Sequence, residues 1–207
     1  MMRSSLAGST TAPLRRPTIG RSLGGVNRQL TNLSTAAEAY FSRYRYPEWL
    51  VTHSRVVGRI AEALVGARRS GAPAIDVAAA VLAAYLHDIG RSPLLEGDSH
   101  EHNELSALVL AAEGLPACVE PARRHAIYTV LDPLTAPRTA TEKLVYVADR
   151  RGGQGVQPLV ERARDTARRH PRFATEIERA IPLALEIERE VFADVTFSAD
   201  ALAERVR

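Results

Sequence analysis

Apolar residues recur at spacings of three and four along most of the chain, which is the period of an amphipathic α-helix. From Leu30 onward, no stretch of useful length alternates in polarity as a half-buried strand does. Aromatic residues make up only 5% of the chain, whereas alanine and leucine, the best helix formers, are abundant. The pattern therefore predicts an all-α fold. One predicted helical face illustrates it, with Leu50, His53, Val57, Ile60, Ala61 and Leu64 on the same side.

The positions of proline and glycine give approximate helix ends. Pro47 suits a first helical turn, Gly71 suits a C-cap, and Pro182 is expected to kink or split the last long helix. The predicted helices span residues 32–45, 47–71, 75–88, 104–113, 117–130, 139–151, 157–169 and 173–193, with a short one from Ala199 onward.

The first 28 residues differ from the rest in composition. They are rich in Ser, Thr, Gly, Pro and Arg, show no apolar period, and carry five arginines and no acid. Because the whole chain has a formal charge of +3, the remainder is close to −2. We predict a disordered basic tail over 1–28 and a single helical domain over 29–207. The nearly neutral body argues against nucleic acid as a partner.

Cysteine content and hydropathy bound the setting of the protein. Cys118 is the only cysteine, so an intrachain disulfide is excluded. The longest apolar run, from Val77 to Leu86, is far shorter than the ~20 residues that span a bilayer. The N-terminus lacks the apolar region of a signal peptide. We therefore expect a cytoplasmic protein without a membrane partner, and the sequence leaves open whether it forms a homodimer.

Two apolar runs end in a carboxylate. "VLAAYLHDIGR" closes with His87 and Asp88, followed at once by Gly90 and Arg91, and "KLVYVAD" closes with Asp149. Burying such a carboxylate without a partner costs several kcal/mol, and no lysine or arginine precedes either aspartate at helical spacing within its run. A divalent cation would neutralise both. Imidazole with carboxylate suits Mn, Fe, Co, Ni or Zn, and argues against a thiolate zinc site.

The order of these residues resembles the HD superfamily of metal-dependent phosphohydrolases, an all-helical fold. The resemblance covers residues 47–152: "HDIGR" matches the His-Asp motif, "THSRVVGRIAEAL" its opening histidine helix and "TEKLVYVAD" its closing aspartate helix. It implies an HD-type domain with this motif core and with C-terminal helices over 157–207. It also implies a metal held by His53, His87, Asp88 and Asp149.

Some branches of the superfamily add two histidines and hold a second metal. "HNELSALVL" and "ARRHAIYTV" resemble their elements, which implies His102 and His125 as further ligands and Asp88 as the bridge between two ions. Iron or manganese is favoured, and cobalt, nickel, magnesium or zinc remain open. Asp88 is the implied catalytic residue, and Arg91 and Arg150 are the candidates for binding a substrate phosphate.

Among the branches, the chain is most similar to the small stand-alone HDIG-type proteins near the diadenosine tetraphosphate hydrolases. It departs from them after His125, where "YTVLDPLTAPRTA" replaces a His-Thr loop. The resemblance implies that a metal-activated hydroxide hydrolyses a phosphoester or phosphoanhydride of a nucleotide or dinucleotide, a small phosphorylated molecule.

Two alternative functions remain open, and so do the roles of several residues. One alternative is a nucleoside 5'-monophosphatase with a single metal. The other is a non-catalytic regulatory or nucleic-acid-binding helical module with a structural metal. His102 and His125 could instead be core residues bonded to backbone carbonyls. His100 and His170 are expected in a loop and on the surface, and the arginine pairs starting at Arg68, Arg123, Arg150 and Arg168 on mostly solvated faces.

Overall fold

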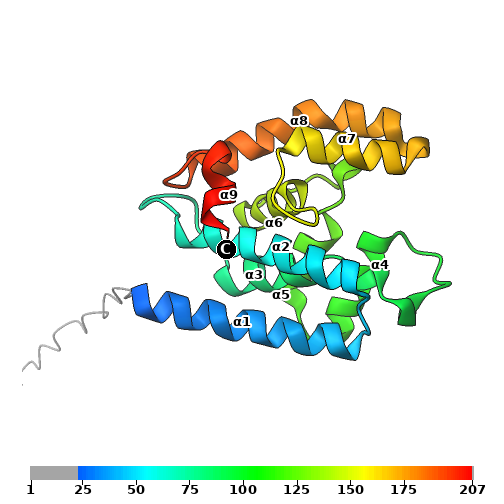
Figure 1. Cartoon of the computed structure of the whole chain (residues 1–207), viewed down its shortest axis with the longest axis horizontal. Helices are drawn as coiled ribbons and strands as arrows, with labels where there is room; N and C mark the ends of the chain where they lie inside the picture. The colour runs from blue at the N-terminus through cyan, green and yellow to red at the C-terminus, as the bar shows by residue number, and fades with distance from the viewer. Residues whose placement is uncertain (1–22, 207) are drawn as a thin grey trace, which may run out of the picture.

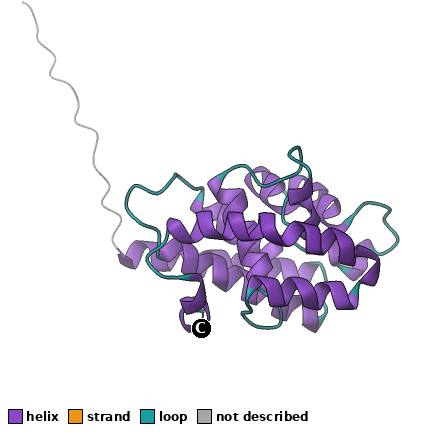
Figure 2. Cartoon of the chain, turned by 90° about the horizontal axis from the view of Figure 1, so that it is seen from above, coloured by secondary structure: helices purple, strands orange, loops and turns teal. Residues whose placement is uncertain are grey.

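The computed structural model describes residues 23–206, with side chains from Arg28 onward (Figure 1). Within these residues there are α-helices, 3-10 turns and loops but no strand, so the all-α prediction is confirmed (Figure 2). None of the described helices is both long and apolar enough to cross a membrane. The α-helices are α1 (Leu23–Arg43), α2 (Glu48–Gly66), α3 (Val77–Leu86), α4 (His102–Ala112), α5 (Pro116–Arg123), α6 (Ala140–Arg151), α7 (Leu159–Arg169), α8 (Ala174–Ala193) and α9 (Leu202–Arg205).

Helix α3 forms the centre of the fold and contacts α1, α2, α5 and α6. Every residue from Ala79 to Leu86 is buried, as expected of a helix that is apolar on all sides. Its start is fixed by Asp76, whose side chain accepts a hydrogen bond from the Ala79 N–H at 3.0 Å. Helix α1 lies on one side of this centre, and α7 and α8 lie on the other (Figure 1). The residues that follow α3, His87 and Asp88, are therefore held in the interior.

Helix α6 joins this centre to the outer pair of helices. It begins with a capping box between Thr139 and Glu142 and packs against α2, α3 and α8. At its last residue, Arg151 pairs with Glu188 of α8 at 3.0 Å and also donates to the Ala199 carbonyl at 2.8 Å. Both charged side chains of this pair are buried. The expectation of a solvated face is therefore wrong for Arg151, because α8 supplies a carboxylate that covers it.

One predicted helix end and one predicted helix break differ from the structure for identifiable reasons. Helix α2 ends at Gly66 rather than near Gly71, because the next residues bond to a distant segment: the Ala67 carbonyl accepts from the Thr196 N–H at 3.0 Å. Helix α8 runs unbroken through Pro182, so the predicted split does not occur. Pro182 is exposed, which leaves the carbonyl that lost its partner accessible to water.

Three further boundaries differ from the prediction. Helix α1 begins at Leu23, inside the predicted tail, and the rest of that tail, residues 1–22, lies outside the described residues. Helix α4 begins at His102, two residues early. The predicted helix over 117–130 is interrupted, because Ala126 is extended (ψ 142°) and a 3-10 turn, Ile127–Leu131, follows it. His125 consequently lies in the connection after α5 rather than within a helix.

Candidate metal centre

Four helices and one connection bring the six predicted ligands to one place in the interior. Helix α2 contributes from its second turn, α3 from its C-terminal end, α4 from its first residue and α6 from its last turn. Five of the six residues are buried, and the sixth, His102, is partly exposed. The set is His53 from α2, His87 and Asp88 after α3, His102 from α4, His125 after α5 and Asp149 from α6.

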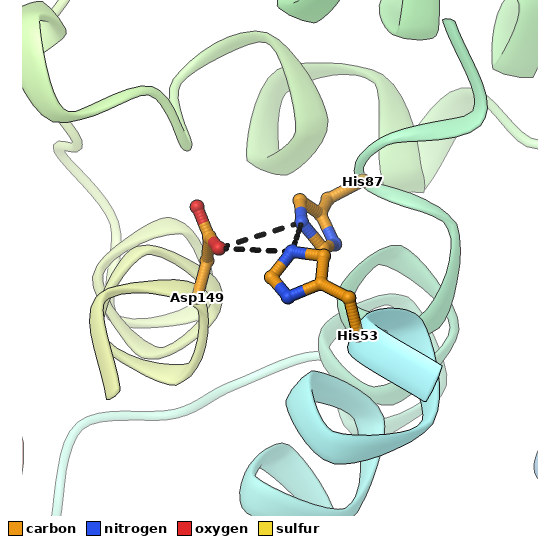
Figure 3. Close-up of side chains that lie close together, drawn as sticks. All are labelled: His53, His87 and Asp149. Carbon is orange, nitrogen blue, oxygen red and sulfur yellow. Dashed lines mark hydrogen bonds and ion pairs between the residues drawn. The ribbon is translucent and has the colours of Figure 1, made fainter. Parts of the chain in front are cut away.

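An inner group consists of His53, His87 and Asp149, whose side chains point toward one another (Figure 3). The two Nε2 atoms lie 3.1 Å apart, and they lie 3.3 Å and 3.5 Å from Asp149 Oδ1. Atoms bound to one ion at about 2.1 Å lie roughly 3 to 3.5 Å from each other. The inner group therefore has the spacing of ligands around a single metal ion.

An outer group consists of Asp88, His102 and His125. Asp88 Oδ1 lies 3.4 Å from His125 Nε2 and 3.6 Å from His102 Nε2. The other carboxylate oxygen, Oδ2, lies 3.7 Å from the Nε2 atoms of both His53 and His87. Asp88 thus stands between the two groups and presents one oxygen to each.

Backbone carbonyls orient three of the four imidazole rings. The Nδ1–H of His53 donates to the Gly153 carbonyl at 3.3 Å, that of His87 to Ala84 at 2.8 Å, and that of His125 to Ala122 at 2.6 Å. Each bond leaves Nε2 with its lone pair directed at the centre of the site, as metal ligation requires. No sequence pattern identified these carbonyls, since any residue type can supply one.

The charges of the site fit a bound cation. Two lone pairs 3.1 Å apart, on His53 and His87, repel unless a positive charge lies between them. Burial lowers the pKa of His87, but the charges of Asp88 and Asp149 outweigh burial and raise that pKa. A proton on His87 can therefore supply the positive charge between the two rings when no metal is bound. A divalent ion in the same place satisfies both rings and the carboxylates, which shows that these residues suit a metal.

The outer histidines have the neutral form that ligation needs. Burial lowers the pKa of His102 to about 3, and it also lowers the pKa of His125. Burial raises the pKa values of Asp88 and Asp149, but neighbouring cations outweigh it, with Arg91 the largest for Asp88 and Arg150 the largest for Asp149. Both pKa values lie well below the usual range, so both carboxylates are ionised.

The two arginines proposed for substrate binding contact the aspartates directly. Arg91 Nε lies 2.9 Å from Asp88 Oδ1, and its side chain is 40% exposed. Arg150 pairs with Asp149 Oδ2, the oxygen that faces away from the inner histidines, and its side chain is 12% exposed. Both arginines follow their aspartate in sequence, outside the apolar run that precedes it.

Gly90 allows the outer group to assemble. Its N–H donates to Ser106 Oγ at 2.9 Å, and that hydroxyl donates in turn to the His102 carbonyl at 2.8 Å. A Cβ at position 90 would lie 2.4 Å from the His102 carbonyl oxygen and 2.8 Å from the Ser106 nitrogen. A glycine must therefore follow the His-Asp pair if the first turn of α4 is to lie against it.

The remaining histidines lie outside the site. The ring of His100 is half exposed and bonds to Asp98 in its own loop at 2.7 Å. His170 is exposed at the end of α7. Neither His100 nor His170 therefore lies with the six predicted ligands.

A family comparison agrees with this geometry. Residues 50–151 match the family described as the HD domain. Residues 50–151 form an HD domain. This span contains all six candidate ligands, from His53 to Asp149. HD domains bind divalent metals, and their superfamily is one of metal-dependent phosphohydrolases. Neither the curated proteins nor the solved structures give a significant match to the chain.

Proposed function

We propose that this HD domain is a phosphohydrolase that cleaves a phosphoester or phosphoanhydride bond of a nucleotide or dinucleotide. The observation that supports it most directly is the position of Asp88, which offers one oxygen to His53 and His87 and the other to His102 and His125. A carboxylate between two groups of imidazole nitrogens suits a pair of divalent ions. Within the superfamily, the motifs favour the HDIG-type branch near the diadenosine tetraphosphate hydrolases.

The inner group with Asp88 Oδ2 would hold one ion, and the outer group a second. Divalent ions held there would lower the pKa of a bound water to near 7, against about 15.7 in bulk, and would neutralise charge on phosphoryl oxygens. We expect iron or manganese, because imidazole and carboxylate ligands suit both. Asp88 would be the catalytic residue, since its two carboxylate oxygens face the inner and the outer group respectively.

The two arginines would bind the substrate phosphate. Arg91 is the more exposed of the two and lies beside the outer group, where its guanidinium can reach an incoming phosphate oxygen. Arg150 is held by Asp149, and its Nε is a buried donor without a partner among the described residues, which a phosphate oxygen entering the site would satisfy. Two guanidinium groups beside the carboxylates would offset the charge that a phosphate brings into the site.

One contact favours the nucleoside 5'-monophosphatase alternative. Arg91 bonds to Asp88 Oδ1, the same oxygen that a second ion would share with His102 and His125. If Arg91 keeps that bond, its guanidinium takes the place of the second cation and the site holds one ion.

The proposal is tested by assaying the purified chain against nucleoside monophosphates, diphosphates and dinucleoside polyphosphates. Each substrate is tried with Mn, Fe, Co, Ni, Mg and Zn, and metal content is measured by elemental analysis. We expect hydrolysis with at least one metal and abolition of hydrolysis in Asp88→Ala. Asp98→Asn is the matched control, because that aspartate bonds only within an exposed loop.

Two results would overturn the proposal. Absence of bound metal after reconstitution would show that the six residues do not form a metal centre. Retention of more than a tenth of the activity in Asp88→Ala would place catalysis elsewhere.

A further inference from the structure

Trp49 is the only tryptophan of the chain, and its side chain is unusually accessible. It lies in the first turn of α2 and is 50% exposed. Among residues 28–206, its indole ring has no stacking, cation–π or hydrogen-bond partner. An aromatic face that is open to solvent and has no partner can stack against the flat face of a ligand.

Trp49 lies next to the metal centre along the same helix. His53 is four residues later, so the two side chains lie on the same face of α2, about 6 Å apart along the helix axis. The loop between α6 and α7 forms hydrogen bonds with both residues. Gln154 Nε2 donates to the Trp49 carbonyl at 3.1 Å, and the Gly153 carbonyl accepts from His53 Nδ1. The indole therefore stands at the edge of the site.

A second residue near Trp49 also lacks a partner. The hydroxyl of Tyr46, three residues earlier, is buried and has no hydrogen-bond partner among the described residues. Burial raises the pKa of Tyr46, and the charge of Asp88 raises it further, so the hydroxyl lies within the electrostatic reach of the site. A buried polar group without a partner among the described residues therefore precedes Trp49 by three residues in the chain.

We propose that Trp49 is the stacking platform for the nucleobase of the substrate, with the Gln154 carboxamide beside it to bond to the base edge. This inference rests on the proposed function and specifies its substrate as one with an accessible base. With the phosphate at the ions and arginines, the base lies one sugar away, toward the N-terminal end of α2. Every base has a flat face that stacks on an indole, and a carboxamide can both donate and accept.

The steady-state test compares AMP with ribose 5-phosphate, which differ only in the base. We expect Trp49→Ala to raise KM for AMP by about 10- to 100-fold and leave KM for ribose 5-phosphate unchanged. Trp49→Phe should keep KM for AMP close to the wild-type value, because a phenyl ring can also stack on a base. Leu183→Ala, at an exposed apolar position on α8, is the control and should leave KM for both substrates unchanged.

Fluorescence supplies an independent measurement, because the only tryptophan signal comes from Trp49. We expect AMP to quench it and ribose 5-phosphate to leave it unchanged. The stacking role would be overturned if Trp49→Ala raised KM equally for both substrates, or raised it for neither. If the chain hydrolysed no phosphoester, quenching by AMP alone would support the base platform while the proposed function failed.

Discussion

The inner and outer groups of the metal centre differ in how far solvent reaches them. The inner side chains of His53, His87 and Asp149 are at most 7% exposed. In the outer group the side chain of His102 is 20% exposed, and the Arg91 side chain that bonds to Asp88 is 40% exposed. Water and substrate therefore reach the outer group first, and an ion in the inner group is enclosed by protein.

The difference follows from where each ligand lies on its helix. His53 lies within α2 and Asp149 near the end of α6, and these helices pack against each other and against α3 along their length. The outer histidines come from the first residue of α4 and from the connection after α5. His102, at the first residue of α4, is the ligand that reaches the surface, whereas the other five are buried. We infer that an ion in the inner group would be held more firmly than one in the outer group.

The largest effect is expected from the inner group. His53→Ala and Asp149→Asn should each remove the inner ion and abolish hydrolysis, because either change leaves only three of the four ligands that would hold that ion, Asp88 Oδ2 included. Metal content and activity are measured together on the purified variants. His100→Ala is the matched control, since that ring bonds only to Asp98 in an exposed loop. Full metal content in either inner variant would contradict the assignment.

Loss of an outer histidine should be severe but incomplete. His102→Ala and His125→Ala should each lower metal content from about two ions to about one. Activity should fall by more than the 10- to 100-fold expected when a residue only orients a ligand. If wild type and both variants hold one ion, the outer histidines are core residues and the monophosphatase alternative gains support. Elemental analysis distinguishes these outcomes.

Two glycines allow each group to be disturbed separately. Gly90→Ala places a Cβ 2.4 Å from the His102 backbone oxygen, so α4 must shift and the outer ion should bind about 10- to 100-fold more weakly. Gly152→Ala places a Cβ 2.5 Å from Val57 Cγ2, a side chain on α2, the helix that also carries His53. We expect Gly152→Ala to lower stability by about 1–3 kcal/mol and leave the outer ion in place. Metal titration and thermal unfolding of both variants test this contrast.

The smallest expected effect is on the reactivity of Cys118, a buried thiol with no neighbouring cation among the described residues to stabilise its thiolate. Burial raises the pKa of Cys118 to about 12, so the thiol stays protonated at pH 8 and should not react with iodoacetamide in the folded protein. Asp88 is also buried, but neighbouring cations keep it ionised. Mass spectrometry before and after unfolding measures the labelling. Labelling that begins when a chelator is added would show that the metal also stabilises α5, where Cys118 lies.

The sequence predicts more about the inner group than about the outer one. Helical periodicity places His53 on a buried face, and the apolar run before Asp149 places that carboxylate inside, because both patterns are local. His125 was expected within a helix, but the extended backbone at Ala126 ends that regularity, and no residue type in the segment signals it. The pairing of Arg151 with Glu188 joins positions 37 residues apart, so only the packing of α6 on α8 reveals it.

Two of the ligands also terminate helices. The rings of His87 and His125 each donate to the carbonyl three residues earlier, which is one of the last carbonyls of α3 and of α5. The same hydrogen bond that directs Nε2 toward the centre thus prevents the helix end from fraying. An ion bound to these rings would slow amide hydrogen exchange in the final turns of both helices. Metal release and local unfolding would then be one event, and the exchange rates of those amides would report how long an ion stays bound.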